Sequence, residues 1–225
     1  MTRSIRIAIA GAGKVGRYVA RDLVSKGHEI VLIEQNKSKI KQVKEELDVH
    51  FVAGDACEIH TLDEAVLSSC DVMVAATGDD EDNLVISLLA KQEFAVPRVV
   101  ARVNYPDNQW LFNETWGIDV SVSTPHLLTS LVEEAVSVGD LVTLLRLEQG
   151  KVGLLEVTLA EGSPAEGKTC GELSMPPDST LVAVVREGHV VAPKSDTPLH
   201  AGDEVLALAS PEAEADLKRA LAGED

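Results

Sequence analysis

The sequence predicts an α/β protein, namely a Rossmann-like, doubly wound parallel sheet followed by a small α+β C-terminal domain. Two observations predict the first part: short aliphatic runs alternate with segments of helical periodicity, and a glycine-rich turn follows the first run. A third observation predicts the second part. From residue 141 onward, apolar strand-like runs follow one another, and one helical segment closes the chain.

The first half alternates between strands and helices that short loops connect. The expected strands are residues 5–10, 29–33, 49–53, 71–76, 97–103 and 118–122. The expected helices are residues 15–26, 36–47, 58–69, 81–94 and 107–116. Strands buried on both faces are aliphatic throughout, and β-α-β connections are right-handed. This order therefore indicates a parallel sheet covered by helices on both sides.

One more helix, residues 124–138, precedes the change in character. Thr124 is a suitable N-cap for it, and Pro125 a suitable first helical residue. Beyond Gly139 and Asp140 we expect strands at residues 141–147, 153–159, 180–186, 189–192 and 204–209, and a helix at 211–222. We therefore place the first domain at 1–138, including this helix, and the second at 141–225.

Composition restricts the possible functions. Hydrophobic residues make up 45% of the chain but aromatic residues only 3%, so the core must be aliphatic. The net charge of −17 disfavours a nucleic-acid partner. Three cysteines without a CxxC pair are expected to be free thiols in a reducing compartment. We expect no signal peptide and no membrane span, and hence a cytoplasmic protein.

The turn after the first strand has G-x-G-x-x-G spacing. It consists of Gly11, Ala12, Gly13, Lys14, Val15 and Gly16. The first glycine permits the tight turn, the second lets a phosphate approach the backbone, and the third lets the helix pack on the strand. A phosphate would then lie at the helix N-terminus. Lys14 is either a second phosphate contact or a solvated lysine, and the residues alone do not decide between these.

An acidic residue, Glu34, ends the second strand about twenty residues after Gly13. We expect its carboxylate to accept hydrogen bonds from the ribose hydroxyls of a dinucleotide and to disfavour the 2′-phosphate of NADP. Asp55 and Thr77 end the third and fourth strands, at the edge where ligands bind in this fold. Asp55 is a candidate contact to an adenine amino group and Thr77 to the ribose; turn or cap chemistry is the alternative for both.

Residues that a dehydrogenase would need are missing. The sequence has no Y-x-x-x-K pair, and its six histidines are scattered without metal-ligand spacing. The acidic run at residues 79–82 is a possible metal site but is more typical of a helix N-terminus, where carboxylates interact with the dipole. An NAD-dependent oxidoreductase therefore remains only an alternative.

Several segments together resemble a known family. They are GAGKVG, VLIE, GDA, AATGDDEDN, PRVVARVNYP and WGIDVSVSTP in the first half, and EGSPAEGKTCGEL and LVAVVREGHVVAPKSDTPLHAGDEVLALA in the second. The first set resembles an RCK (KTN) domain and the second a TrkA-C domain. One copy of each resembles the regulatory subunits of Trk/Ktr-type potassium uptake, and ARVN with VSTPHLLTSLVEEAVSVGDL resembles their actinobacterial branch.

The resemblance implies a cytoplasmic, homo-oligomeric ring beneath a membrane-embedded potassium-translocating subunit. It implies NAD(H) or ATP/ADP as the ligand and the three motif glycines as the phosphate turn. It also implies Glu34 at the ribose, Asp55 and Ala56 at the adenine, Thr77 with the adjoining Gly78 beside the ribose, and Arg102 at the phosphate edge.

Two positions leave questions open. Lys14 stands where an ATP-binding branch of the family carries arginine. Thr124-Pro125-His126 stands where that branch has His-Pro-Glu, whose glutamate serves a divalent cation. The choice between ATP and NAD(H), and the role of a metal, therefore stay open. The second domain is expected to mediate subunit contact or to bind a second small ligand. Regulation of another cation transporter is a further alternative.

Overall fold

The computed structural model describes residues 4–136, 138–147 and 151–223 and divides the chain into two compact units. The first unit is Met1–Pro125 and the second His126–Asp225. The sequence placed the boundary at 138–141. From His126 onward, the helix that begins at Thr124 therefore belongs to the second unit. Position 137 of that predicted helix lies outside the described residues.

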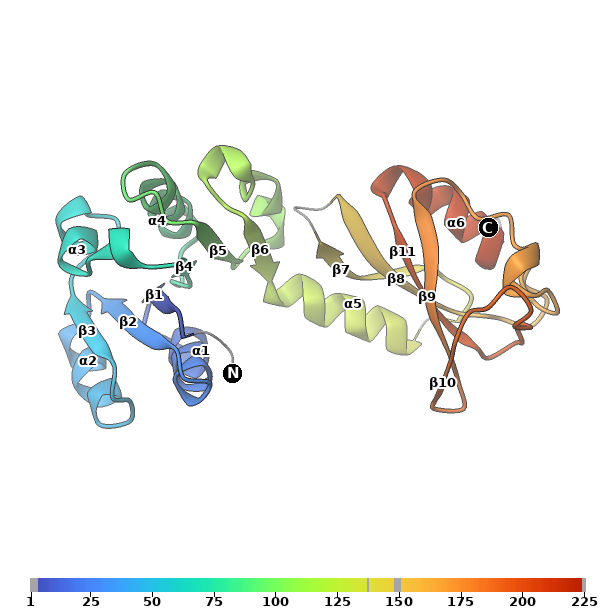
Figure 1. Ribbon diagram of the computed structural model, residues 1–225, viewed down its shortest axis with the longest axis horizontal. Coiled ribbons are helices and arrows are strands. Elements are labelled where there is room, and N and C mark those ends of the chain that lie inside the picture. The colour runs from blue at the N-terminus through green and yellow to red at the C-terminus, as the bar shows by residue number, and fades with distance from the viewer. Residues whose placement is uncertain (1–3, 137, 148–150, 224–225) are drawn as a thin grey trace. The chain divides into compact units, whose positions relative to one another are not determined.

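The first unit contains a six-stranded parallel sheet in the order β3-β2-β1-β4-β5-β6 (Figure 1). Its strands are β1 (Arg6–Ala10), β2 (Glu29–Glu34), β3 (His50–Ala53), β4 (Val72–Ala75), β5 (Arg98–Val103) and β6 (Val120–Ser123). The strand order reverses direction between β1 and β4, which is the switch point of a doubly wound fold. The predicted Rossmann-like fold class is confirmed.

Helices cover both faces of this sheet. They are α1 (Lys14–Ser25), α2 (Lys37–Lys44), α3 (Ile59–Glu64) and α4 (Asp80–Gln92). One buried cluster joins α1 and α2 to one face through Ala20 and Val43. The other joins α3 and α4 to the opposite face through Leu62 and Ile86. Both clusters are almost entirely aliphatic, as the low aromatic content predicted.

Two predicted helices differ from the structure. The segment expected at 58–69 ends as an α-helix at Glu64, turns at Val66 with φ 51°, and continues as the 3-10 helix η1 (Leu67–Ser69). Ala65 and Leu67 are both fully buried, and a straight helix would direct residues two apart to different sides. The break therefore lets both side chains reach the core.

The helix expected at 107–116 is instead two 3-10 helices, η2 (Pro106–Leu111) and η3 (Glu114–Trp116). Asn113 separates them, since its backbone is extended and its side chain accepts a hydrogen bond from the Thr115 amide at 2.9 Å. An asparagine side chain that bonds its own backbone in this way competes with a continuous helix.

The second unit is built on a five-stranded antiparallel sheet in the order β10-β9-β11-β8-β7 (Figure 1). Its strands are β7 (Val142–Leu147), β8 (Val152–Thr158), β9 (Ser179–Arg186), β10 (His189–Val191) and β11 (Glu204–Ala209). Its helices are α5 (Thr124–Val136), which lies in this unit from His126 onward, α6 (Glu214–Leu221) and the 3-10 helices η5 (Cys170–Glu172) and η6 (Pro211–Ala213). Leu217 and Leu221 of α6 complete the core over β8 and β11.

A buried ion pair fixes the loop before β11. Asp203 is fully buried, and its carboxylate accepts hydrogen bonds from Arg186 Nε and Nη2, both at 2.7 Å, and from the His200 amide at 2.9 Å. Burial alone would raise the pKa of Asp203, but the bonds from Arg186 and His200 outweigh it and hold the pKa below its ordinary value. Among the residues that the structure describes, no helix has the length and apolarity needed to cross a bilayer.

Candidate nucleotide-binding site

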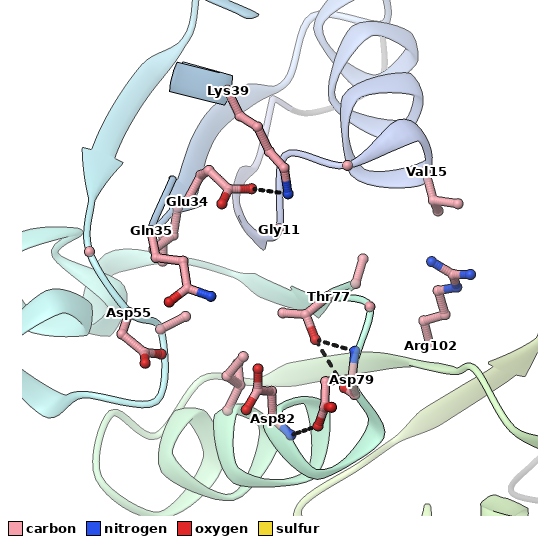
Figure 2. A pocket seen from close by; sticks show the side chains of 17 residues that line it. Gly11, Val15, Glu34, Gln35, Lys39, Asp55, Thr77, Asp79, Asp82 and Arg102 are labelled. Carbon is pink, nitrogen blue, oxygen red and sulfur yellow. Dashed lines mark hydrogen bonds and ion pairs between the residues drawn. The ribbon is translucent and has the colours of Figure 1, made fainter. Parts of the chain in front are cut away.

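A cavity of about 460 Å³ opens at the carboxyl edge of the parallel sheet (Figure 2). Its walls come from the residues that follow β1, β2, β3 and β4 and from the end of β5. Ligands of open α/β sheets bind in this crevice, because the loops on either side of the strand-order reversal diverge there. The cavity therefore lies where the fold predicts a ligand.

Nine of the twelve residues expected to bind the ligand line this cavity. They are Gly11, Gly13, Val15, Glu34, Asp55, Ala56, Thr77, Gly78 and Arg102. Ala12 and Gly16 are buried beneath it, and Lys14 is exposed outside its lining.

Each glycine of the turn has a distinct steric role. Gly11 adopts φ +98°, and a Cβ atom on it would approach the Ala76 carbonyl oxygen to 2.8 Å. A Cβ atom on Gly16 would lie 1.9 Å from the Gly11 carbonyl oxygen, so only glycine lets α1 pack this closely. By contrast, a Cβ atom on Gly13 would have nothing within 4 Å. The open space beside Gly13 is where the motif predicts a phosphate.

The N-terminus of α1 faces this space without a cap. Its N-cap residue is Gly13, which has no side chain that could accept a hydrogen bond from the first amide groups. The first turn also contains no acidic residue. The first amide groups of a helix have no partner within the helix and carry the positive end of its dipole. An anion at Gly13 would accept hydrogen bonds from these amide groups and would interact favourably with the helix dipole.

The Glu34 side chain holds the glycine turn in place through a hydrogen bond. Its side chain is only 6% exposed; Oε2 accepts a hydrogen bond from the Ala12 amide and Oε1 one from the Asn36 amide, both at 2.9 Å. Gly11 donates its own amide to the Ile33 carbonyl oxygen at 2.9 Å. Each carboxylate oxygen can accept a second hydrogen bond, so Glu34 remains able to bind ribose hydroxyls.

Two cationic side chains line the cavity on different sides. Lys39 Nζ lies 3.7 Å from Glu34 Oε2, and the Arg102 guanidinium extends toward Val15 at the start of α1 (Figure 2). The Nε atom of Arg102 is buried and has no hydrogen-bond partner. A buried donor without a partner is costly, and a phosphate oxygen would supply the acceptor. The donors present thus fit a phosphate-bearing ligand.

Acidic side chains form the remaining wall. Asp79 caps α4, since its Oδ1 accepts the Asp82 amide at 3.3 Å, and Asp55 Oδ1 accepts the Cys57 amide at 2.9 Å. Burial and then the charge of Asp79 raise the pKa of Asp82. Burial and then the charges of Asp82 and Asp55 raise the pKa of Cys57 to about 12, so its thiol stays protonated at neutral pH.

Asp79 of the acidic run is thus the N-cap of α4, and Asp80, Glu81 and Asp82 lie in the first turn of that helix. Within the part of the chain that the structure describes, no three metal-ligating side chains converge on one point.

Sequence reasoning missed four polar residues of the cavity. They are Gln35, Lys39, Asp79 and Asp82. Gln35 and Lys39 lie one and five residues beyond Glu34, within the loop and helix that the motif's acidic residue already located. That short separation was the signal that could have found them. Asp79 and Asp82 were recognised only as part of a helix N-terminus.

Two family models match the sequence. The TrkA-N domain matches residues 7–124 and the TrkA-C domain residues 154–222. The chain is 51% identical over 217 residues to the Trk system potassium uptake protein TrkA of Mycobacterium tuberculosis (strain ATCC 25618 / H37Rv), covering 96% of this chain and 98% of that protein. It is 32% identical over 217 residues to the TrkA homolog of Methanothermobacter thermautotrophicus, covering 96% and 99%.

Solved structures with the same fold include a channel in two ligand states. The GsuK channel bound to NAD has a TM-score of 0.63 at 20% identity, covering 100% of this chain and 41% of that chain. The GsuK bound to ADP has a TM-score of 0.53 at 20% identity, covering 62% and 36%. At this identity the likeness establishes the fold. The resemblance inferred from the sequence motifs is confirmed by the family models and the close relatives.

Proposed function

We propose that this chain, which belongs to the TrkA family of Trk-system potassium-uptake proteins, is a regulatory subunit. In this proposal it binds an adenine nucleotide, NAD(H) or ATP/ADP, in the cavity at the carboxyl edge of its parallel sheet. The observation that carries the proposal is the convergence of the Gly13 opening, the uncapped N-terminus of α1 and the unpartnered Nε of Arg102 on one cavity. All three are complementary to phosphate.

The ligand's parts correspond to different walls. Phosphates bind at the first turn of α1 and at Arg102, and the ribose hydroxyls bind at Glu34. Asp55 and Ala56 approach the adenine, and Thr77 and Gly78 line the ribose side. The NAD-bound and ADP-bound states of GsuK, which has this fold, support the choice of an adenine nucleotide.

Regulation follows from linkage. A nucleotide shifts a protein between two shapes only if it binds one of them more tightly. We propose that copies of this chain assemble into a ring on the cytoplasmic face of the membrane and gate a potassium-translocating subunit. Helix α5 supports self-assembly, because Leu128, Leu131, Val132 and Val136 are more than half exposed on it.

Calorimetry and transport together test the proposal. Purified protein should bind NADH or ADP measurably, and light scattering should show a dimer or larger even assembly. Deleting the gene should impair potassium uptake in its native host, and restoring the wild-type chain should recover it, whereas a variant without nucleotide binding should not regulate uptake normally. A monomeric protein that binds none of NADH, ADP and ATP would refute the proposal.

A further inference from the structure

The first turn of α4 carries two buried polar side chains that do not line the cavity. Asn83 is fully buried and Asp80 is 1% exposed. Burying an amide or a carboxylate is unfavourable unless hydrogen bonds compensate for the lost hydration. The partners of these two groups therefore show which parts of the fold they hold in place.

The Asn83 amide joins two walls of the cavity. Its Oδ1 accepts a hydrogen bond from the Thr77 amide at 2.9 Å and lies 2.8 Å from the Thr77 hydroxyl oxygen. Its Nδ2 donates to the Arg102 carbonyl oxygen at 2.9 Å. Thr77 follows β4, and Arg102 lies near the end of β5. One side chain thus fixes the backbone of both cavity residues relative to α4.

Asp80 holds the chain that follows β5. Its Oδ1 accepts hydrogen bonds from the Asn104 amide at 2.6 Å and from the Asn104 side chain at 3.0 Å. Its Oδ2 accepts one from the Tyr105 amide at 3.0 Å and one from Asn108 Nδ2 at 2.9 Å. The backbone at Arg102 is therefore held twice. Asn83 bonds the Arg102 carbonyl oxygen, and Asp80 bonds the amide of Asn104, two residues later in the chain.

We propose that Asn83 is a positioning residue of the nucleotide site, which fixes Arg102 for contact with a ligand phosphate and Thr77 beside the ribose. The proposal rests on the proposed nucleotide function and goes beyond it, since Asn83 itself does not line the cavity. The Nε atom of Arg102 has no hydrogen-bond partner. The Asn83 bond to the Arg102 carbonyl oxygen instead fixes the backbone from which the guanidinium extends.

A double-mutant cycle with ADP as the probe tests this role. Arg102→Met should lower ADP affinity about tenfold or more, the value of a charge-assisted hydrogen bond. Asn83→Ala should lower it about fivefold in the wild-type background. In the Arg102→Met background, Asn83→Ala should cost less affinity than in the wild-type background, because only Thr77 remains of the two side chains that Asn83 positions.

Lys39 and Ser87 provide matched controls. Lys39 lines the cavity beside Glu34, so Asn83→Ala and Lys39→Met should have effects that multiply. Ser87 is fully buried one turn further along α4, and its hydroxyl donates to the Asn83 carbonyl oxygen at 2.6 Å. Ser87→Ala should destabilise the protein but leave ADP affinity within about twofold.

The outcomes separate this inference from the function on which it rests. Wild-type protein that binds no nucleotide would overturn the proposed function and this inference with it. Normal wild-type binding combined with multiplying effects of Asn83→Ala and Arg102→Met would overturn only the positioning role. If Asn83→Ala shows no cooperative thermal transition, the same cycle is measured with Asn83→Ser, and the same two outcomes decide.

Discussion

Replacing Gly13 with aspartate should abolish nucleotide binding without unfolding the protein. The site can accept a side chain, because Gly13 has φ −70° and ψ −173° and a Cβ atom there would have no neighbour within 4 Å. Aspartate is also a better N-cap than glycine by a few tenths of a kcal/mol, and its charge at the helix N-terminus contributes roughly 0.3–1 kcal/mol. Thermal stability should therefore stay equal or rise slightly.

Binding should respond in the opposite direction. A carboxylate about 4 Å from a bound phosphate, at an effective dielectric constant of about 20, opposes binding by about 4 kcal/mol. That corresponds to an affinity loss of about 1000-fold. The aspartate side chain also caps the amide groups that the phosphate would use. The neutral variant Gly13→Asn caps them equally well but lacks the charge, so it should lose much less affinity.

Calorimetric titration with ADP and NADH, together with thermal unfolding followed by circular dichroism, measures both effects. The reasoning is refuted if Gly13→Asp binds nucleotide as tightly as the wild-type protein. It is also refuted if this variant melts well below the wild type, since the steric environment of Gly13 would then not be open. Equal losses for Gly13→Asp and Gly13→Asn would show that charge repulsion is not the cause.

Three further perturbations follow from the same geometry. Gly16→Ala should destabilise the protein by about 3 kcal/mol or more, since its Cβ atom would overlap the Gly11 carbonyl oxygen; an unchanged melting temperature would contradict this. Glu34→Gln should raise NADPH affinity relative to NADH, and an unchanged ratio in calorimetry would show that Glu34 does not exclude the 2′-phosphate. The depressed pKa of Asp203 means that its bond to Arg186 contributes stability above the ordinary aspartate pKa, and that this contribution is lost as the pH falls through the lower folded-state value. Asp203→Asn should therefore lower the free energy of unfolding by about 1–3 kcal/mol at pH 7. It should also make the free energy of unfolding fall less steeply as the pH is lowered, and an equally steep fall in the variant would argue against this assignment.

The glycine turn was predictable because its requirements belong to the backbone. The spacing of Gly11, Gly13 and Gly16 after an aliphatic strand leaves few conformations, and Glu34 completes the pattern at the expected distance. The same is true of the parallel sheet, whose strands are continuous aliphatic runs. The predictions based on these patterns agree with the positions that the structure shows.

The hydrogen bonds that Asp80 and Asn83 make behind the cavity could not be predicted from the local sequence pattern. Asp80 bonds Asn104 and Asn108 across 24 and 28 residues, and Asn83 bonds Arg102 across 19. Contacts at such separations depend on how α4 packs on the sheet, which periodicity does not encode. For the same reason the sequence could identify the acidic run as a helix start but could not show that one of its carboxylates is buried.

Hydrogen bonds within the protein hold the turn after β1, because the Gly11 amide donates to the Ile33 carbonyl oxygen and the Ala12 amide donates to the Glu34 carboxylate. A loop in this condition loses little conformational entropy when a ligand arrives, so more of the contact energy appears as affinity. The same order leaves the loop few alternative conformations, and a ligand can redistribute a population only among conformations that exist. Any nucleotide-driven change of shape in this unit should therefore begin at another wall of the cavity than the glycine turn.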